Sequence, residues 1–532
     1  MKKYILIFSL FFFHIVLAQE AADIETSIPV YPGEPGKQPF WNTYAKRFIY
    51  APAFDFPEIK GALSYRFTIT GDDNKQEQFV ANKPWKPLSP VWDKISEGYT
   101  ALVVEGLDGK KKTIGIAGKR SFYKSPGFSG KYSEPEVSYQ ASGLKGLKAL
   151  FDAPNVQYWL THAVPDPAYN LYCYPNKVMG GVIRAMAAYS KVVPKKQDQA
   201  ASLKIAKSAA DYLLSVRYSN GWRYANVPPT YLANVDKPTP EAMKGAEKQW
   251  LMVPSTVDAA FGFLDLYDIT QDKKYLDAGN EIAKVLARTQ ENDGTWPLMV
   301  NAETGEPVHA QRLIPTWVIF FFDRFAHQYK ITEYKTARKR AWEWIVNNPL
   351  KTFQWNGQFE DIHPQAPYMN LAREQACDVA VLLLDEIENP EKIAQAEELL
   401  RFAEDQFVFW QPVKSPEGLR KAIGNSKRLP EEWFTPSVIE QYRVYEPVAR
   451  SCAIMINAYL KAHQATKKSQ YLNKAKAIAN TLVNAQSWVE KTYGGTGEIP
   501  TWVWKKKPSN WLNNSYYAAQ AVLNMANAAP AK

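Results

Sequence analysis

Cysteine is scarce in this sequence of 532 residues, which contains only Cys173, Cys377 and Cys452. Three cysteines cannot all pair with one another, and none stands in a spacing typical of a zinc site or a disulfide framework. Cys377 and Cys452 fall on apolar faces of predicted helices, where a buried thiol packs as a small hydrophobic group. The sequence therefore excludes a disulfide-stapled scaffold and a cysteine-based metal centre.

Histidine and metal-binding motifs are also rare. The chain has six histidines, and neither an H-E-x-x-H motif nor a dense Asp/Asn loop occurs. We therefore expect no metal and no cofactor, with a calcium ion held by loop carboxylates as an open alternative.

Long apolar runs are missing beyond the first residues, so no later segment is predicted to enter a membrane. Lys2 and Lys3 precede an apolar run that ends at Leu17, and Ala18 offers a small residue for cleavage before Gln19. These features predict a secretory signal peptide at residues 1–18. We expect an exported protein, either periplasmic or secreted.

Charge and aromatic content indicate the kind of partner. The formal net charge is +10, and loss of Lys2 and Lys3 with the signal peptide would leave +8. A basic protein attracts acidic partners, and export argues against nucleic acid. The 17 tryptophans and 30 tyrosines supply faces on which sugar rings stack. We expect an acidic oligosaccharide or polysaccharide as the partner, whereas the oligomeric state is left open.

Strand-like alternation is confined to the part before Pro135. Residues 64–70 alternate, and residues 100–110 form a second strand that enters a turn at Asp108-Gly109. Short strands at this spacing predict a small β-sandwich within residues 19–135. The segments resemble fibronectin-type-III-like modules that precede catalytic domains in exported carbohydrate-active enzymes, which implies a role in packing or positioning.

Helical periodicity repeats along the rest of the chain. Consecutive runs are separated by alternately short and long connections, which indicates successive antiparallel hairpins in a solenoid or closed toroid. The runs cover residues 177–189, 202–216, 255–267, 274–287, 314–325, 335–346, 371–384, 393–407, 447–460, 471–483 and 515–525.

Long connections join one predicted hairpin to the next. Because the helices alternate in direction, all of these connections must emerge at the same end, and their Trp, Tyr, His and Arg residues predict a functional face there. They cover residues 217–253, 290–313, 347–370, 410–445 and 486–514.

Three Gly-Trp motifs follow the second helix of a hairpin: "NGWRY" at Asn220, "ENDGTWP" at Glu291 and "YGGTGEIPTW" at Tyr493. They resemble elements of (α/α) toroid enzymes, among them polysaccharide lyases and glycoside hydrolases. With the N-terminal module, the chain resembles bacterial enzymes that degrade uronic-acid polysaccharides, such as ulvan-oligosaccharide lyases, dehydratases and glucuronidases. The resemblance implies a mainly α fold, with a complete or incomplete (α/α)6-type toroid as the catalytic domain at residues 136–532.

β-Elimination at a uronate requires a base, an acid and a group that stabilises the carboxylate. His309 and Arg312 precede an apolar helix within the functional face, so we assign proton transfer to His309 and carboxylate binding to Arg312. Each of these two residues also has a purely structural interpretation, which for His309 is a cap on the helix that follows. The candidate catalytic residues are His309, Tyr368, His363 and Tyr231, and the candidate substrate-binding residues are Arg312, Arg443, Arg223, Tyr445, Trp250 and Trp433.

Two other functions remain open at this point. Glycoside hydrolysis needs two carboxylates, about 5.5 Å apart for retention and roughly 6.5–9.5 Å for inversion. The loops offer Asp293, Glu303, Glu306, Glu360 and Asp361 for that purpose. A non-catalytic glycan-binding protein would need only the aromatic residues. We favour elimination by a lyase or dehydratase, because His, Tyr and Arg on the predicted face outnumber convincing carboxylate pairs.

Overall fold

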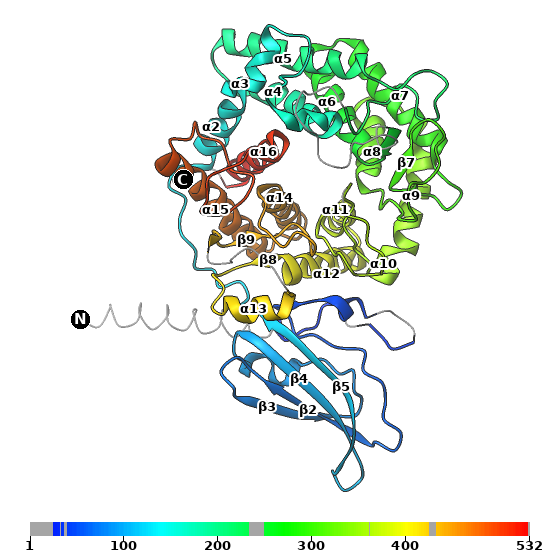
Figure 1. Ribbon diagram of the computed structural model, residues 1–532, viewed down its shortest axis with the longest axis vertical. Helices are drawn as coiled ribbons and strands as arrows, with labels where there is room; N and C mark the ends of the chain where they lie inside the picture. Colours follow the sequence, from blue (N-terminus) through cyan, green and yellow to red (C-terminus); the bar gives the residue numbers. More distant parts are fainter. Residues whose placement is uncertain are drawn as a thin grey trace, which may run out of the picture.

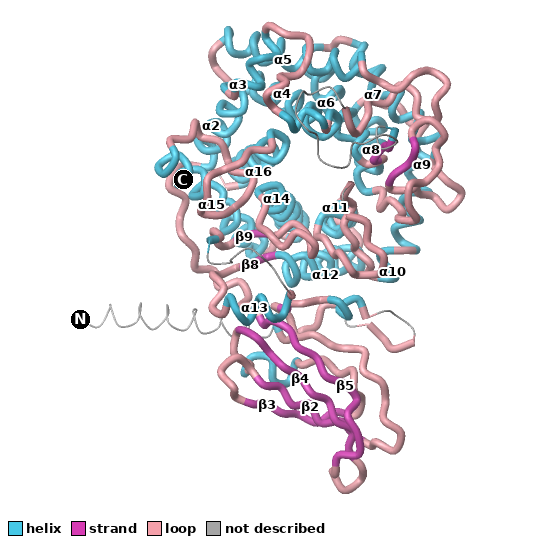
Figure 2. The backbone as a smooth tube through the Cα atoms, viewed as in Figure 1, coloured by secondary structure: helices cyan, strands magenta, loops and turns pink. Residues whose placement is uncertain are grey.

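A ring of helices lies above a β-sheet in the computed structural model (Figures 1 and 2). The structure describes residues 25–31, 33–36, 40–232, 249–360, 362–424 and 432–529, so the predicted signal peptide lies outside the described residues. Within these ranges, no helix has both the length and the apolarity that a membrane span requires.

The N-terminal sheet has the strand order β1-β5-β4-β2-β3. β1 runs parallel to β5, and the other neighbours are antiparallel. Alternation along β2 buries Tyr65, Phe67 and Ile69, as a half-buried strand requires. The strands are β1 (Arg47–Phe48), β2 (Ser64–Thr70), β3 (Gln76–Ala81), β4 (Gly98–Leu107) and β5 (Thr113–Lys124).

The predicted β-sandwich is replaced by this single sheet in the part of the chain that the structure describes. A coil segment covers the buried face instead of a second sheet. A Cβ atom at Gly118 would lie 2.1 Å from Cδ1 of Phe56, and one at Gly106 would lie 3.0 Å from Cβ of Ile59. The alternating pattern predicts a buried face correctly, but a coil that carries Phe56 and Ile59 covers such a face as well as a sheet does.

Two concentric layers of helices form the toroid (Figure 1). Each inner helix contacts the next, and α16 contacts α4, so the ring of described inner helices is closed. The inner helices are α4 (Gly180–Val192), α6 (Ser255–Thr270), α8 (Thr316–Gln328), α11 (Glu374–Leu383), α14 (Ala449–Thr466) and α16 (Leu512–Ala528). The outer helices are α2 (Tyr139–Asp152), α5 (Lys196–Ser215), α7 (Lys273–Thr289), α9 (Lys335–Asn347), α12 (Pro390–Phe407) and α15 (Ser469–Tyr493).

Short elements occupy the connections. The 3-10 helices are η1 (Trp41–Tyr44), η2 (Ser89–Lys94), η3 (Tyr158–Leu160) and η4 (Asn170–Cys173), and η5 (Pro175–Met179) is a π-helix. Short α-helices are α3 (Pro154–Gln157), α10 (Pro349–Thr352) and α13 (Pro416–Ile423). Two small sheets pair β6 (Trp250–Met252) with β7 (Met299–Asn301) and β8 (Val408–Phe409) with β9 (Ser437–Val438).

The predicted helical runs omit α2, which packs against α16 and lies next to the closure of the ring. Two glycines allow this close packing. A Cβ atom at Gly143 would lie 2.5 Å from Cγ of Leu523, and one at Gly146 would lie 3.1 Å from Cβ of Ala519. Glycine is a poor helix former, so the residues that fit α2 to its partner also weaken its signal in the sequence.

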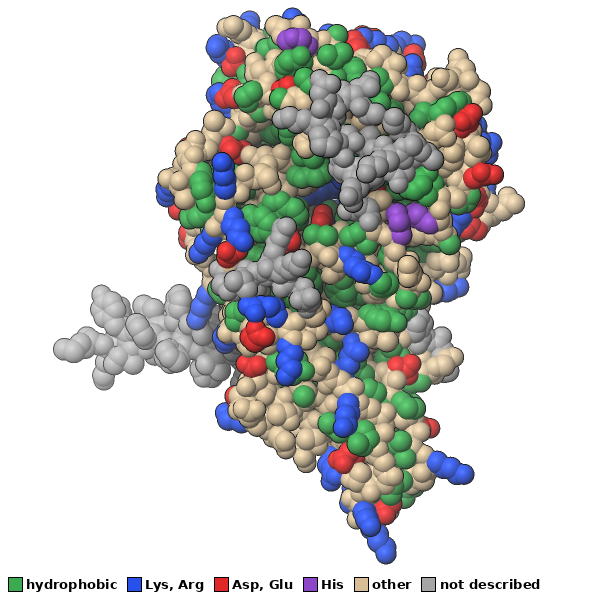
Figure 3. Space-filling model, viewed as in Figure 1, with side chains coloured by type: hydrophobic (Ala, Val, Ile, Leu, Met, Phe, Trp, Pro, Cys, Tyr) green, Lys and Arg blue, Asp and Glu red, His purple; other side chains and the backbone are tan. Residues whose placement is uncertain are grey.

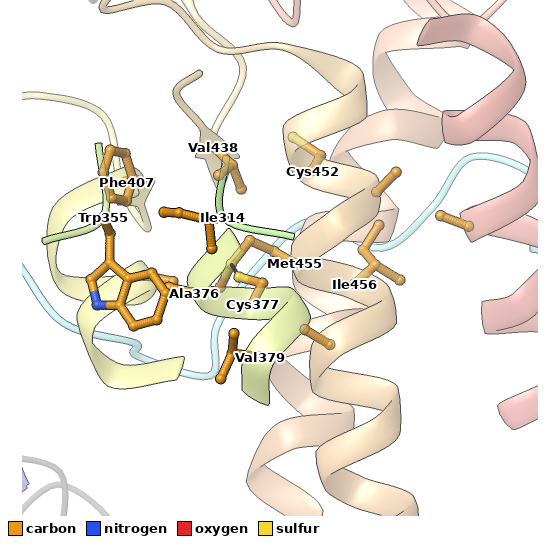
Figure 4. Close-up of a cluster of buried hydrophobic side chains, with 14 of the residues drawn as sticks. Ile314, Trp355, Ala376, Cys377, Val379, Phe407, Val438, Cys452, Met455 and Ile456 are labelled. Carbon is orange, nitrogen blue, oxygen red and sulfur yellow. Dashed lines mark hydrogen bonds between the residues drawn. The ribbon is translucent and has the colours of Figure 1, made fainter. Parts of the chain in front are cut away.

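The three cysteines are free and buried. Figure 4 shows Cys377 and Cys452 among apolar side chains, with Met455 beside Cys377. The sulfur atoms of Cys377 and Met455 lie 3.4 Å apart. The prediction that these two thiols pack as hydrophobic groups is therefore confirmed.

Buried polar contacts fix the sheet to the toroid. Arg47, only 1% exposed, donates from Nε to Oγ of Ser125 at 2.6 Å, and its guanidinium lies 4.1 Å from the ring of Phe409. The carboxylate of Asp405, in α12, accepts the backbone N–H groups of Ile49 and Tyr50 at 2.6 and 2.9 Å. β5 ends at Lys124 and α2 begins at Tyr139, so the predicted boundary at residue 135 falls in the connection between them.

Candidate active site

Residues in or just before the first turns of the inner helices line a cavity of about 320 Å³ at one end of the toroid. Each of the five long connections also contributes to its wall, for example through Met252, Leu313, Glu360, Glu440 and Trp502. The prediction that these connections share one end is thereby confirmed. Figure 3 shows basic and acidic side chains in a hollow near the centre of the helical ring.

Two ion pairs lie in the wall of the cavity. Lys177, in η5, donates from Nζ to Oε1 of Glu360 at 2.5 Å. Burial alone would raise the pKa of Glu360, but the charge and hydrogen bond of Lys177, together with a backbone hydrogen bond and the charge of Arg450, hold the pKa below its ordinary value. Glu360 is therefore ionised at neutral pH. The second ion pair joins Arg450, in α14, to Glu374, with Nη2 of Arg450 donating to Oε1 of Glu374 at 2.7 Å.

Asp258, in the first turn of α6, differs from these paired carboxylates. Burial raises its pKa to about 6, although Arg450, Arg184 and a hydrogen bond from Tyr517 counteract the effect. The Tyr517 hydroxyl donates to Oδ1 of Asp258 at 3.2 Å. A carboxyl group with this pKa can carry a proton close to neutral pH and release it to a bound molecule.

Arg373 and Glu440 complete the charged part of the lining. Arg373 is 1% exposed and donates from Nη1 to the backbone oxygen of Glu440 at 2.5 Å, while its Nε has no partner among the described residues. Burial raises the pKa of the Glu440 carboxyl. Among the described residues, no group of three or more His, Cys, Asp or Glu is arranged to hold a metal ion.

Aromatic rings form much of the remaining wall. Trp317, Trp502, Trp511, Tyr174 and Phe359 line the cavity. Nζ of Lys177 lies 5.0 Å from the ring of Trp511, and the Arg450 guanidinium lies 5.2 Å from the ring of Trp317. These contacts hold the cationic groups against ring faces and leave a wall with both flat apolar and charged surfaces.

The structure brings His309 and His363 together, but neither belongs to the described lining of the cavity. Their ring centroids lie 4.1 Å apart. Nδ1 of His309 accepts the backbone N–H of Gln311 at 3.2 Å. Burial and the neighbouring His363 lower the pKa of His309 to about 4, so this imidazole is neutral at neutral pH. Since neither imidazole lines the cavity, the pair lies apart from the charged groups there.

Arg312 is engaged in the loop rather than offered to a ligand. It pairs with Glu291 at 2.6 Å and with Asp293 at 2.7 Å. Tyr368 is buried and donates its hydroxyl to the backbone oxygen of Thr352 at 2.6 Å. Among the described residues these side chains stabilise the connections and do not line the cavity, contrary to the roles predicted for Arg312 and Tyr368.

Tyr231 is buried against Tyr174, with ring centroids 5.8 Å apart, and so lies behind the wall. The remaining predicted residues also lie outside the described lining. Arg223 and Arg443 are exposed, Tyr445 and Trp433 are buried, and Trp250 begins β6. The long connections lie at the predicted end of the toroid, but these side chains do not belong to the described lining of the cavity.

Sequence reasoning missed most of the cavity residues because it searched the loops rather than the helix starts. Lys177, Asp258, Glu374 and Arg450 precede or occupy the first turns of inner helices. A signal was present, because a helix that follows a long connection must begin at the same end as that connection. Charged residues in these first turns could therefore have been predicted as site candidates.

No protein-family model matches the chain, and no curated protein matches it. Solved structures with similar folds include a family 76 glycoside hydrolase from a bovine Bacteroides thetaiotaomicron strain, with 12% identity, coverage of 87% of this chain and 93% of the other, and a TM-score of 0.45. Cellobiose 2-epimerase from Spirochaeta thermophila DSM 6192 has 12% identity, coverage of 72% and 96%, and a TM-score of 0.48. An unsaturated glucuronyl hydrolase specific for heparin has 12% identity, coverage of 73% and 96%, and a TM-score of 0.43. Because these values are low, we assign no function from them, and the ulvan-type resemblance stays a prediction.

Proposed function

We propose that the protein hydrolyses a glycosidic bond in an acidic oligosaccharide. One observation carries this proposal: the cavity holds two carboxyl groups whose surroundings act on their pKa values in opposite directions. Burial raises the pKa of Asp258 to about 6, whereas Lys177 holds that of Glu360 below its ordinary value against the effect of burial. A carboxyl group that can hold a proton near neutral pH and one that stays ionised are the two components of glycoside hydrolysis.

Asp258 is the proposed general acid. Its proton would pass to the glycosidic oxygen as the bond from that oxygen to the anomeric carbon breaks. Glu360 is the proposed ionised partner, which would either activate water or attack the anomeric carbon. The aromatic wall formed by Trp317, Trp502 and Trp511 supports a sugar as the ligand, because ring faces stack on pyranose rings.

Arg373 supports an acidic substrate. Lys177 and Arg450 each pair with a carboxylate, but the Arg373 guanidinium has only the backbone oxygen of Glu440 as a hydrogen-bond partner in the described part of the chain. A buried guanidinium can bind a carboxylate through two hydrogen bonds. We therefore assign the uronate-binding role, predicted for Arg312, to Arg373.

Elimination at a uronate is the competing reaction. The residues predicted for it, His309, Tyr368 and Tyr231, are absent from the described lining of the cavity. Carboxyl groups occupy the positions around the cavity instead, and this favours hydrolysis over the elimination that we expected from the sequence.

The test is to incubate the full-length protein with uronic-acid oligosaccharides in water enriched in 18O. Hydrolysis should place one 18O atom in the products for each bond cleaved, with no ultraviolet band of an unsaturated uronate. Products that absorb in the ultraviolet and contain no 18O would establish elimination. Binding without any product would support the non-catalytic glycan-binding alternative, and in both cases the proposal would be wrong.

A further inference from the structure

A chain of polar side chains continues from the cavity along the inner helices. The Tyr517 hydroxyl, in α16, lies 3.2 Å from Oδ1 of Asp258 in α6 and 3.0 Å from Nη1 of Arg184 in α4. The Tyr517 hydroxyl therefore lies between the carboxyl group of Asp258 and the guanidinium of Arg184. All three side chains are partly buried between inner helices.

The chemistry of arginine fixes the direction of these hydrogen bonds. A guanidinium has N–H donors and no acceptor, so the oxygen of Tyr517 must accept from Arg184. The single hydrogen of the hydroxyl then remains for Asp258, whose Oδ1 accepts it. Oδ1 is held as an acceptor, and no described residue forms a hydrogen bond to Oδ2.

Further ion pairs prevent Arg184 from turning away. Its Nε pairs with Oδ2 of Asp265 at 2.9 Å, and Oδ1 of Asp265 binds Nη1 of Arg324 at 2.7 Å. Arg324 also pairs with Asp268 at 2.8 Å. Asp265 thus bridges two arginines with its two oxygens, which orients the donor that Arg184 presents to Tyr517.

We propose that Tyr517 is a positioning residue that occupies Oδ1 of Asp258, so that the exchangeable proton of this carboxyl group lies on Oδ2. The site of the proton is a property of the resting protein, whereas its use in turnover rests on the proposed function. In turnover the Oδ2–H bond breaks, the proton joins the glycosidic oxygen, and the leaving sugar departs as an alcohol. Asp258 is left as a carboxylate that regains a proton from water.

Other charged groups also face Asp258. Arg450, from α14, and Arg184, from α4, stabilise its ionised form, whereas Glu374, from α11, opposes ionisation. Lys177, from η5, lines the same cavity. Replacement of Tyr517 by phenylalanine leaves all of these charges in place, so its effect on Asp258 reports the loss of one hydrogen bond.

The test compares Tyr517→Phe with wild type by carbon NMR titration of protein labelled at the aspartate carboxyl carbon, with Asp258→Asn to identify the resonance. Loss of a hydrogen bond that stabilises the ionised form should raise the titration midpoint of Asp258 by about one pH unit. In the protonated state, the infrared C=O stretch of Asp258 should move to higher frequency in Tyr517→Phe, because Oδ1 no longer accepts a hydrogen bond.

Tyr329→Phe is the matched control. The Tyr329 hydroxyl donates to Oδ1 of Asp268 at 2.8 Å, so this variant removes the same kind of bond elsewhere in the network. It should leave both signals of Asp258 unchanged. Arg184→Lys, which keeps the charge but loses the planar fork, gives a second route if Tyr517→Phe does not fold, and it should also raise the midpoint.

An unchanged or lowered midpoint in both Tyr517→Phe and Arg184→Lys would overturn the proposal, as would an unshifted C=O stretch in Tyr517→Phe. These signals do not require turnover. If they shift as expected and no substrate is cleaved, the proposed function fails while the position of the proton stands. If the enzyme is active, the high-pH limb of its kcat profile should move upward in Tyr517→Phe together with the NMR midpoint.

Discussion

At the residue scale, the same type of side chain acquires different chemistry within one cavity. Asp258 and Glu360 are both carboxyl groups, but only Glu360 has a lysine within ion-pair distance. Burial penalises the charge of both groups, and the ion pair with Lys177, together with a backbone hydrogen bond and Arg450, overcomes that penalty at Glu360, whereas the arginines near Asp258 do not overcome it there. The ion pair with one ammonium group is therefore a main difference between the proposed proton donor and the ionised carboxylate.

Replacement of Asp258 by asparagine should lower turnover of an acidic oligosaccharide by about 10²–10⁴-fold, the scale of general acid–base catalysis. Asparagine keeps the shape of the side chain and an oxygen that can accept from Tyr517, but it has no acidic proton. Steady-state rates on a purified oligosaccharide provide the measurement. Glu303→Gln, in an exposed loop outside the cavity lining, is the control and should retain near-normal rates. Full activity in Asp258→Asn would remove Asp258 from the mechanism.

Replacement of His309 by alanine should change turnover by less than about threefold, because the imidazole lies outside the cavity lining and is neutral across the physiological range. The measurement is the rate of product formation, with the melting temperature to confirm folding. A loss of about 10²-fold in a folded His309→Ala protein would instead return proton transfer to the pair of His309 and His363.

At the element scale, the site depends on how closely α4 and α6 pack at their first turns. A Cβ atom at Gly180, the first residue of α4, would lie 2.9 Å from the backbone oxygen of Asp258. Backbone atoms cannot rotate away as the end of a flexible side chain does. The position of the proposed acid is therefore linked directly to a glycine in the neighbouring helix.

Gly180→Ala should displace the first turn of α6 and with it Asp258. We expect a loss of turnover of about tenfold or more, since small misplacements of catalytic groups are costly, and a melting temperature lower by a few degrees. Rates and thermal unfolding would be measured on the same preparation. Gly109→Ala is the control, because its Cβ would make only an ordinary contact of 3.5 Å with Leu63. Wild-type rates in Gly180→Ala would show that α6 tolerates the shift.

At the scale of the whole molecule, Asp405 connects the sheet to the toroid through two backbone hydrogen bonds. Burial raises the pKa of its carboxyl to about 6, although those N–H groups, Gln406 and Arg47 act in the opposite direction. An unfolded chain releases this proton at lower pH, near 3.9. Between these two pKa values the folded protein holds a proton on Asp405 that the unfolded chain has released. The contribution of Asp405 to the free energy of unfolding therefore falls as pH rises from about 4 to 6.

Asp405→Asn removes this titration but keeps an oxygen that can accept from Ile49 and Tyr50. The melting temperature of wild type relative to Asp405→Asn should fall by a few degrees between pH 4.5 and pH 7, as the wild-type carboxyl loses its proton. Thermal unfolding of both proteins in matched buffers at these pH values provides the measurement. If the melting temperature of wild type minus that of Asp405→Asn stays constant or rises with pH, the raised pKa of Asp405 is contradicted.

Much of the fold follows from local patterns. The predicted run at residues 255–267 corresponds to α6 (Ser255–Thr270), and the run at 335–346 corresponds to α9 (Lys335–Asn347). Apolar periodicity defines such helices because each buries one face against its neighbours. The strands predicted at residues 64–70 and 100–110 correspond to β2 (Ser64–Thr70) and β4 (Gly98–Leu107). Their alternating pattern indicates a buried face but not that a coil covers it.

The sequence by itself determined the helical hairpins, the shared end of the long connections and the burial of Cys377 and Cys452. These features depend on residues close in the chain or on the alternation of helix direction. Only the tertiary structure decided which charged groups meet in the cavity. Lys177 and Glu360 are 183 positions apart, and the pKa of each depends on the other and on burial. A side chain's orientation within a loop, such as that of Arg312 toward Glu291, is likewise set by contacts that form only when the chain has folded.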